Sequence, residues 1–174
     1  MKRIFTLIIC LATIINSCGY GFYGRGATIR TDIVTVFVES WENFSNEGNI
    51  EVGIRNGLID AIVAGGGARL VSDKNSADAV ITGKVESVTI APLSLTSANI
   101  ATQARVTMVI SASLSRRDDG TTIWETRQLA KSGDYSVASS NVGTDFMGAQ
   151  KQEALTNLCR DVSALLYSLM FSGF

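Results

Sequence analysis

The sequence predicts an α+β domain, with about four strands in a mostly antiparallel sheet and two amphipathic helices packed on one face of it. Three patterns carry this prediction. Residues 33–38 form a β-branched run, and residues 103–115 alternate between apolar and polar side chains, as strands do. Residues 50–62 and 155–169 repeat apolar side chains at helical spacing. Strands and helices that each carry one apolar face must pack against each other in layers.

The chain begins with a segment typical of a secretory signal. Lys2 and Arg3 precede residues 4–15, an apolar run shorter than the ~20 residues that a bilayer-spanning helix needs. A small residue then precedes Cys18, which resembles the signal of a bacterial lipoprotein, whose cysteine receives a diacylglycerol and then a further acyl chain such as palmitate. We therefore expect residues 1–17 to be a lipoprotein signal peptide and Cys18 to be the site of lipid attachment.

Two other interpretations of this segment remain. It could be an ordinary cleaved secretory signal with a coincidental cysteine, or the apolar start of a cytosolic chain. Asn16 departs from the usual lipoprotein pattern, which places Ala, Ser or Thr there and bears on how efficiently the chain is lipidated. The residue after Cys18 is Gly19 and not an aspartate, the acidic residue that acts as an inner-membrane retention signal. We expect a lipid-anchored protein at the periplasmic face of the outer membrane.

The remaining chain has the length of one domain. Removing 17 residues from 174 leaves 157, enough to bury one core. Residues 18–31 combine glycines with three aromatic side chains, so we expect a lipidated tether whose rings dock on the domain or lie at a membrane interface. Residues 32–174 are expected to form the single α+β domain.

Composition argues against several kinds of chemistry. The chain has no histidine, which removes Ser-His-Asp and Cys-His catalysis and the commonest zinc ligand. Beyond Cys18, Cys159 is alone, so no intramolecular disulfide is expected, and its helical context indicates a partly buried thiol. Gly65-Gly66-Gly67 follows a helix instead of opening one, unlike a phosphate loop. We predict no catalytic residues, no metal site and no cofactor.

The first half of the domain alternates between strand and helix signals. Residues 33–38 predict a first strand that is covered on both faces, and residues 41–44 predict a loop. From Asn49 the apolar residues recur at helical spacing, with charged residues on the opposite face. Ser45 or Asn46 is expected to cap this helix at its start.

Glycine and turn residues divide the elements that follow. Gly65-Gly66-Gly67 predicts the end of the helix, and residues 68–71 predict a short second strand. Residues 78–90 predict a long strand whose apolar positions change parity, so we expect a bulge near Ser87. Pro92 is expected to end this strand because proline cannot donate to a ladder.

Residues 103–115 give the clearest strand, with only Val109 breaking the polar face. Asp119-Gly120 predicts a two-residue hairpin turn that leads into a strand over residues 121–129. These two strands should therefore pair antiparallel, with one face buried and the other exposed to solvent.

The end of the chain predicts a loop and then a long helix. Residues 131–148 are rich in glycine and serine, which indicates the end of a strand followed by a long loop. Thr144 or Asp145 can cap a helix of about 25 residues that ends at Ser172-Gly173. Its apolar stripe consists of Leu155, Leu158, Val162, Leu165, Leu166 and Leu169. Charged residues exclude a membrane span here, namely Glu153, Arg160 and Asp161.

Basic residues are the remaining candidates for a binding site. Scattered surface charge is one interpretation, and an anionic lipid head group is the other, because arginine binds phosphate with two parallel hydrogen bonds. With 13 basic and 16 acidic residues after signal removal, nothing indicates nucleic-acid binding. The candidates on or beside the predicted hairpin are Arg105, Arg116, Arg117, Arg127 and Lys131.

Several short motifs together resemble the LptE family of lipopolysaccharide-assembly lipoproteins. Cys18-Gly19-Tyr20 and residues 21–24 follow the signal, and residues 34–39 lead into a glycine-spaced helix. Residues 76–83, Ser-Ala-Asp-Ala-Val-Ile-Thr-Gly, are similar to the family's strand opening. Trp124-Glu125 and the C-terminal amphipathic helix complete a resemblance over nearly all of the mature chain.

This resemblance implies a lipoprotein with two helices and four strands that plugs an LptD-type outer-membrane β-barrel, helps it to assemble and contacts lipopolysaccharide in transit. It carries no catalytic residues over to this chain. We expect Arg116, Arg117 and Lys131 to contact lipopolysaccharide, on the basis of charge and turn placement alone. The alternatives are a periplasmic regulatory or binding lipoprotein, such as an activator of a cell-wall synthase, and, less favoured, an enzyme.

Overall fold

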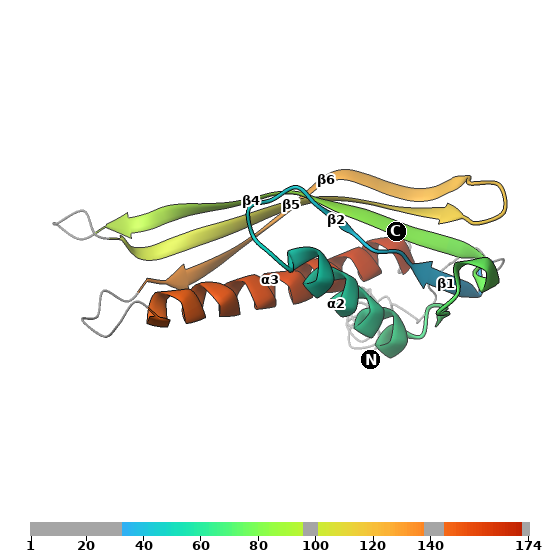
Figure 1. The fold of residues 1–174 in the computed structure, drawn as a ribbon, viewed down its shortest axis with the longest axis horizontal. Helices are drawn as coiled ribbons and strands as arrows, with labels where there is room; N and C mark the ends of the chain where they lie inside the picture. Colours follow the sequence, from blue (N-terminus) through green and yellow to red (C-terminus); the bar gives the residue numbers. More distant parts are fainter. Residues whose placement is uncertain (1–32, 96–100, 138–144, 172–174) are drawn as a thin grey trace, which may run out of the picture.

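A computed structural model describes residues 33–95, 101–137 and 145–171 (Figure 1). The predicted signal peptide and tether, Cys18 included, lie outside these residues, as do residues 138–144 of the predicted loop. The described chain forms an α+β domain with a six-stranded mixed sheet and two helices. In chain order the elements are β1 (Thr35–Val38), β2 (Glu42–Asn43), α2 (Ile50–Gly65), β3 (Arg69–Leu70), a 3-10 turn (Lys74–Ser76), β4 (Ala79–Leu95), β5 (Ala101–Arg116), β6 (Thr122–Ser136) and α3 (Asp145–Phe171).

The sheet combines a parallel part and an antiparallel part. Its strand order is β3-β1-β4-β5-β6, and β2 pairs with the same edge of β4 as β1 does. β1 is parallel to β3 and β4, and β2 is parallel to β4, whereas β4, β5 and β6 are antiparallel neighbours. The α+β class is confirmed, but the prediction of about four mostly antiparallel strands is wrong in detail. β3 lies within the short strand predicted at residues 68–71, whereas β2, with two residues, is too short to show alternation and falls in the predicted loop at residues 41–44.

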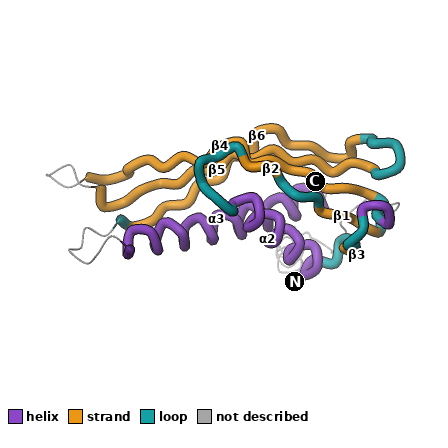
Figure 2. The backbone as a smooth tube through the Cα atoms, in the orientation of Figure 1, coloured by secondary structure: helices purple, strands orange, loops and turns teal. Residues whose placement is uncertain are grey.

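The molecule has two layers, because both helices lie on one side of the sheet (Figures 1 and 2). Alternate residues of the strands point toward the helices and are buried with the apolar stripes of α2 and α3. Val34 is 60% exposed, so the first strand is covered on both faces only from Thr35 onward. The largest buried side chains include Ile54, Leu58, Ile62, Ile81, Met108, Ile110, Leu155, Leu158, Leu166 and Phe171.

The predicted bulge is present, but the predicted end of β4 is wrong. The register between β4 and β5 shifts between Val85 and Ser87, which returns the apolar residues to the helix side. β4 continues past Pro92 to Leu95, with further register shifts after Pro92. Among the described residues, only β5 pairs with this part of β4, so the missing N–H of Pro92 interrupts no second ladder.

The hairpin between β5 and β6 is confirmed, with a longer turn than the sequence predicted. β5 ends at Arg116 and β6 begins at Thr122, and the Arg116 N–H donates to the Thr121 carbonyl at 2.9 Å at the base of the turn. The Gly120 N–H donates a hydrogen bond to the Arg116 carbonyl at 3.1 Å. Gly120 has a φ of 71°, a left-handed conformation that favours glycine. The two strands therefore pair antiparallel around a wider loop.

The helix ends differ in how well the sequence predicted them. Gly66 ends α2 in the left-handed conformation and donates its N–H to the Ile62 carbonyl at 3.1 Å, as expected. At the start, Asn49 is the left-handed cap residue and has no side-chain cap, so capping by Ser45 or Asn46 is wrong. The Ser45 hydroxyl instead binds Asn43. α3 has 27 residues beginning at Asp145, and Thr144, Ser172 and Gly173 lie outside the described residues.

Candidate functional site

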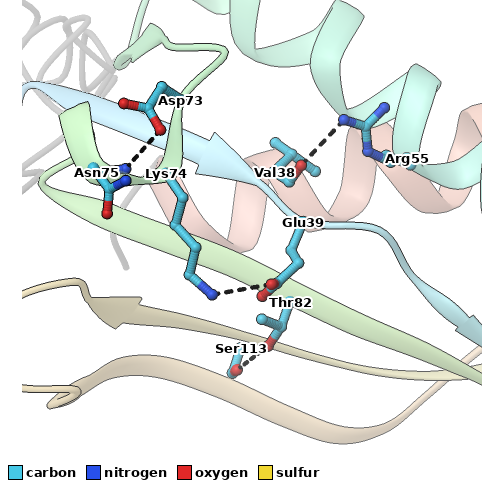
Figure 3. Close-up of polar contacts among 8 residues, drawn as sticks. All are labelled: Val38, Glu39, Arg55, Asp73, Lys74, Asn75, Thr82 and Ser113. Carbon is cyan, nitrogen blue, oxygen red and sulfur yellow. Dashed lines mark hydrogen bonds and ion pairs between the residues drawn. The ribbon is translucent and has the colours of Figure 1, made fainter.

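The face of the sheet opposite the helices is polar and open. No helix or strand of the described residues covers it (Figure 1). Its strands present hydroxyl groups that bind each other across the sheet. Thr82 and Ser113 lie 2.9 Å apart on β4 and β5 (Figure 3), and Thr107 and Ser132 lie 2.9 Å apart on β5 and β6. We call this surface the open face.

Charged groups on the open face also have partners within it. Arg105 donates two hydrogen bonds to Asp134, at 2.6 and 2.8 Å. This pairing lowers the pKa of Asp134 and raises that of Arg105, so both stay charged. Elsewhere Glu86 accepts a hydrogen bond from Ser111 at 2.6 Å, and Arg127 lies 2.9 Å from a neighbouring carboxylate. The open face is therefore rich in polar groups that already satisfy one another.

A hollow of about 630 Å³ lies where the open face meets the loop after β1. Two ion pairs frame it, Lys74 with Glu39 at 3.0 Å (Figure 3) and Lys84 with Glu42 at 3.1 Å. Carboxylates outnumber lysines along its lining, so it suits polar partners better than a phosphate. Its lining comprises Glu39, Ser40, Glu42, Thr82, Gly83, Lys84, Ser111, Ala112, Ser113, Glu125 and Thr126.

Trp41 explains why a glycine occurs in the middle of β4. A Cβ on Gly83 would lie within 2.6 Å of three indole atoms of Trp41, a distance that real side chains do not reach. The ring is buried in the core against this bare stretch of backbone. It thereby fixes the loop between β1 and β2 on the edge of the sheet.

Asp78 holds the start of β1 to the start of β4. One of its carboxylate oxygens accepts the N–H of Val34 at 2.9 Å, the N–H of Thr35 at 2.8 Å and the Thr35 hydroxyl at 2.8 Å. These hydrogen bonds, led by the Thr35 hydroxyl and assisted by the charge of Arg117, lower the pKa of Asp78. The strand-opening motif at residues 76–83 thus contains the residue that joins β1 to β4.

The three basic residues predicted to bind lipopolysaccharide do not form one cluster. Arg116 and Arg117 lie at the hairpin end of β5, where Arg117 donates to the Ala77 carbonyl at 2.8 Å. Lys131 pairs in register with Met108, on the strand position that faces the helices. Eight residues separate Met108 from Arg116, which is about 26 Å along a strand.

Two structural residues went unrecognised at the level of the sequence. Gly57 and Ser163 meet where α2 crosses α3, and the Ser163 hydroxyl lies 2.9 Å from the Ile54 carbonyl. A Cβ on Gly57 would lie 2.7 Å from the Ser163 oxygen, so the crossing requires glycine. The spacing of Gly53 and Gly57 in the sequence could have predicted this crossing, because two glycines one turn apart allow helices to approach closely.

The remaining features give no indication of catalysis in the described part of the chain. Cys159 is buried, more fully than the sequence indicated, and burial followed by the charge of Glu51 raises the pKa of its thiol to about 11. Within the described ranges, no group of three or more possible metal ligands occurs. No helix of those ranges is long and apolar enough to cross a membrane.

Comparison with solved structures shows which known proteins have a similar fold. The rare lipoprotein B from Shewanella oneidensis is similar with a TM-score of 0.54 and 8% identity, over 77% of this chain and 92% of that one. Lipoprotein B from Nitrosomonas europaea has a TM-score of 0.54 and 13% identity, over 77% and 79%. Protein CT253 from Chlamydia trachomatis has a TM-score of 0.51 and 9% identity, over 79% and 98%. At these identities the likeness shows the fold alone.

A family model identifies the chain more closely. The model described as LptE, lipopolysaccharide-assembly, matches residues 33–170, so the chain belongs to this family. Comparison with curated proteins found no match. The family resemblance noted in the sequence is thereby confirmed, and the family is one of lipoproteins without enzymatic activity.

Proposed function

We propose that this chain is an outer-membrane lipoprotein that lies in the lumen of an LptD-type β-barrel, plugs it, helps it to assemble and assists lipopolysaccharide insertion into the outer leaflet. Family membership supports the lipopolysaccharide-assembly role. The lipid anchor at Cys18, the barrel partner and the outer-membrane location belong to the proposal.

The open face is the observation that best supports a barrel partner. The interior of a membrane β-barrel is polar, so a surface that fills it should offer hydrogen bonds without a large unpaired charge. The open face has cross-strand hydroxyl pairs and the two-bond pair of Arg105 with Asp134. Polar groups that are already hydrogen-bonded to each other lose less hydrogen bonding when a partner displaces the water around them. We therefore assign the open face to the barrel wall.

Substitutions on the open face test this assignment. Thr107→Trp places a bulky ring on the open face, and we expect it to reduce co-purification of the barrel in detergent while the domain stays folded. Asn157→Trp adds the same ring to an exposed position of α3 and serves as the control. If both variants retain the barrel equally well, the open face is not the contact surface.

Depletion tests the function as a whole. Loss of the chain should lower both the amount of assembled barrel and the amount of lipopolysaccharide at the cell surface. If neither changes, the proposed function is wrong. A stable complex with a cell-wall synthase and no barrel would instead favour the regulatory lipoprotein.

We propose that the basic residues make a second contact, with lipopolysaccharide itself. Arg116 and Arg117 form one basic point at the hairpin, and Lys131 forms another. We expect Arg116→Asp with Arg117→Asp to weaken binding of lipopolysaccharide to the isolated protein more than Lys131→Asp does, because two adjacent charges reverse together. Equal binding by all variants would remove these residues from the proposal and leave the barrel role intact.

A further inference from the structure

A groove of about 640 Å³ runs between the outer surfaces of α2 and α3. Each wall is a row of exposed residues one turn apart, which shows that the groove opens away from the sheet. On α2 the wall consists of Val52, Asn56, Asp60 and Ala64, and on α3 of Gln152, Thr156, Arg160 and Ala164.

The floor of the groove combines glycine backbone, where the helices cross closely, with the side chains of Ile50, Leu155 and Cys159. Gly53 and Gly57 face Cys159 and Ser163, and a Cβ at either glycine would lie within 3.2 Å of a side-chain atom of α3. A Cβ at Gly57 would force a shift at the crossing, whereas a Cβ at Gly53 would require Cys159 to move by a few tenths of an ångström. The crossing therefore leaves a floor of glycine backbone and apolar side chains, beside which Val52 is 48% exposed.

The groove lies within reach of the chain that precedes the described domain. The Val34 carbonyl accepts the Arg69 N–H at 2.8 Å, so the chain reaches β1 beside β3, directly after the end of α2. Residues 18–32 can span about 50 Å when extended. The wall from Val52 to Ala64 is about 18 Å long. Residues 18–32 are therefore long enough to pass from the sheet layer to the groove and extend along all of it.

The composition of that segment fits the groove. Residues 19–31 contain Tyr20, Phe22 and Tyr23, separated by glycines that let the backbone approach closely. Aromatic rings bury a large apolar area and suit a floor of glycine backbone and apolar side chains. The segment carries Arg25 and Arg30 and no acidic residue, and the groove offers the Asp60 carboxylate on the α2 wall, with Arg160 on the α3 wall.

We propose that residues 19–31 bind in the groove between α2 and α3, with their aromatic rings over Gly53 and Gly57. The segment then continues the domain instead of acting as a free tether. Cys18 is held near the start of α2, so the domain has a fixed orientation relative to whatever surface anchors Cys18. This inference does not depend on the barrel or on lipopolysaccharide.

Limited trypsin digestion of the chain from residue 18 onward, with Cys18→Ser, tests the proposal. Cleavage after Arg25 and Arg30 should be slow in the parent protein, because a bound segment cannot enter a protease. Val52→Asp places a charge on the groove wall and should accelerate this cleavage at least several-fold. Val63→Asp is the matched control, since Val63 is 67% exposed on the same helix but outside the groove, and it should leave the rate unchanged. Equal rates in all three proteins overturn the proposal.

Cross-linking gives a second, independent measurement. Phe22→Cys combined with Ala61→Cys should form an intramolecular cross-link, whereas Phe22→Cys with Ser132→Cys on the open face should not. Both pairs are made in a Cys159→Ala background, because Cys159 lines the groove and would compete for the cross-linker. Cross-links between two molecules would assign the groove to a second copy, and the absence of any cross-link to Ala61→Cys would leave the groove to another partner. Either outcome overturns the proposal, while the proposed barrel role stands or falls by its own tests.

Discussion

The two faces of the sheet are made from the same strands and have opposite chemistry. Along β5, the residues that face the helices are apolar and buried, as Met108 and Ile110 show. Their neighbours Thr107 and Ser111 face the other way and bind polar groups across the sheet. One face thus packs the core of the domain, and the other is the face that we propose for the barrel wall. Substitutions on the two faces should therefore have different consequences.

The largest expected effect comes from a charge in the core. Leu158 is 2% exposed on α3, so Leu158→Asp should unfold the domain, because an unpaired buried charge costs several kcal/mol of a total stability of ~5–15 kcal/mol. Leu165 is only half buried, and Leu165→Asp should destabilise less. Denaturant unfolding measures both. The control is Ser132→Asp on the open face, which should leave the midpoint nearly unchanged. A cooperatively folded Leu158→Asp protein would contradict the packing.

Helix crossing gives the next effect. Gly57→Ala introduces a Cβ 2.7 Å from the Ser163 oxygen and should destabilise by ~1–3 kcal/mol, despite the better helix propensity of alanine. Gly148→Ala makes the same change in α3 where no atom lies within 4 Å, and it should stabilise by ~0.5–1 kcal/mol. Thermal unfolding should therefore shift in opposite directions. Shifts of the same sign would show that the crossing is not tight.

Asp78 should make stability depend on pH. Its pKa is lowered in the folded protein, so its contribution is complete above the unfolded pKa of ~3.9 and is lost as the pH falls through the lower folded value. Asp78→Asn keeps an acceptor oxygen but cannot titrate, and it should flatten the loss of stability in acid. Asp119 and Asp134 also have lowered pKa values and account for the slope that remains. Identical acid unfolding curves for parent and variant would contradict this assignment.

The smallest effect on stability is expected on the open face. Arg105→Ala removes a solvent-exposed ion pair, and such pairs contribute little to folding. Its melting temperature should match that of the parent. Binding of the barrel should nevertheless weaken, because Asp134 is left unpaired in the proposed interface. A variant that loses stability but keeps the barrel would reverse the roles of the two faces.

Periodic patterns in the sequence were enough to predict the main elements. The alternation around Met108 predicts β5, and the apolar stripe around Leu158 predicts α3. Local backbone chemistry also predicted the bulge near Ser87 and the helix end at Gly66. Such signals are readable because the residues that generate each feature are close together in the chain, with a period fixed by the backbone.

Tertiary structure decided the features that join distant residues. Asp78 binds Thr35 across 43 positions, and Ser163 contacts the backbone of Ile54 across 109. The separation of Lys131 from Arg116 likewise follows from strand register and not from their short distance in the sequence. β2 forms because it pairs with the edge of β4, since two residues have no periodicity of their own. Sequence period determines which face a residue takes, whereas only the packed sheet determines which residues share a site.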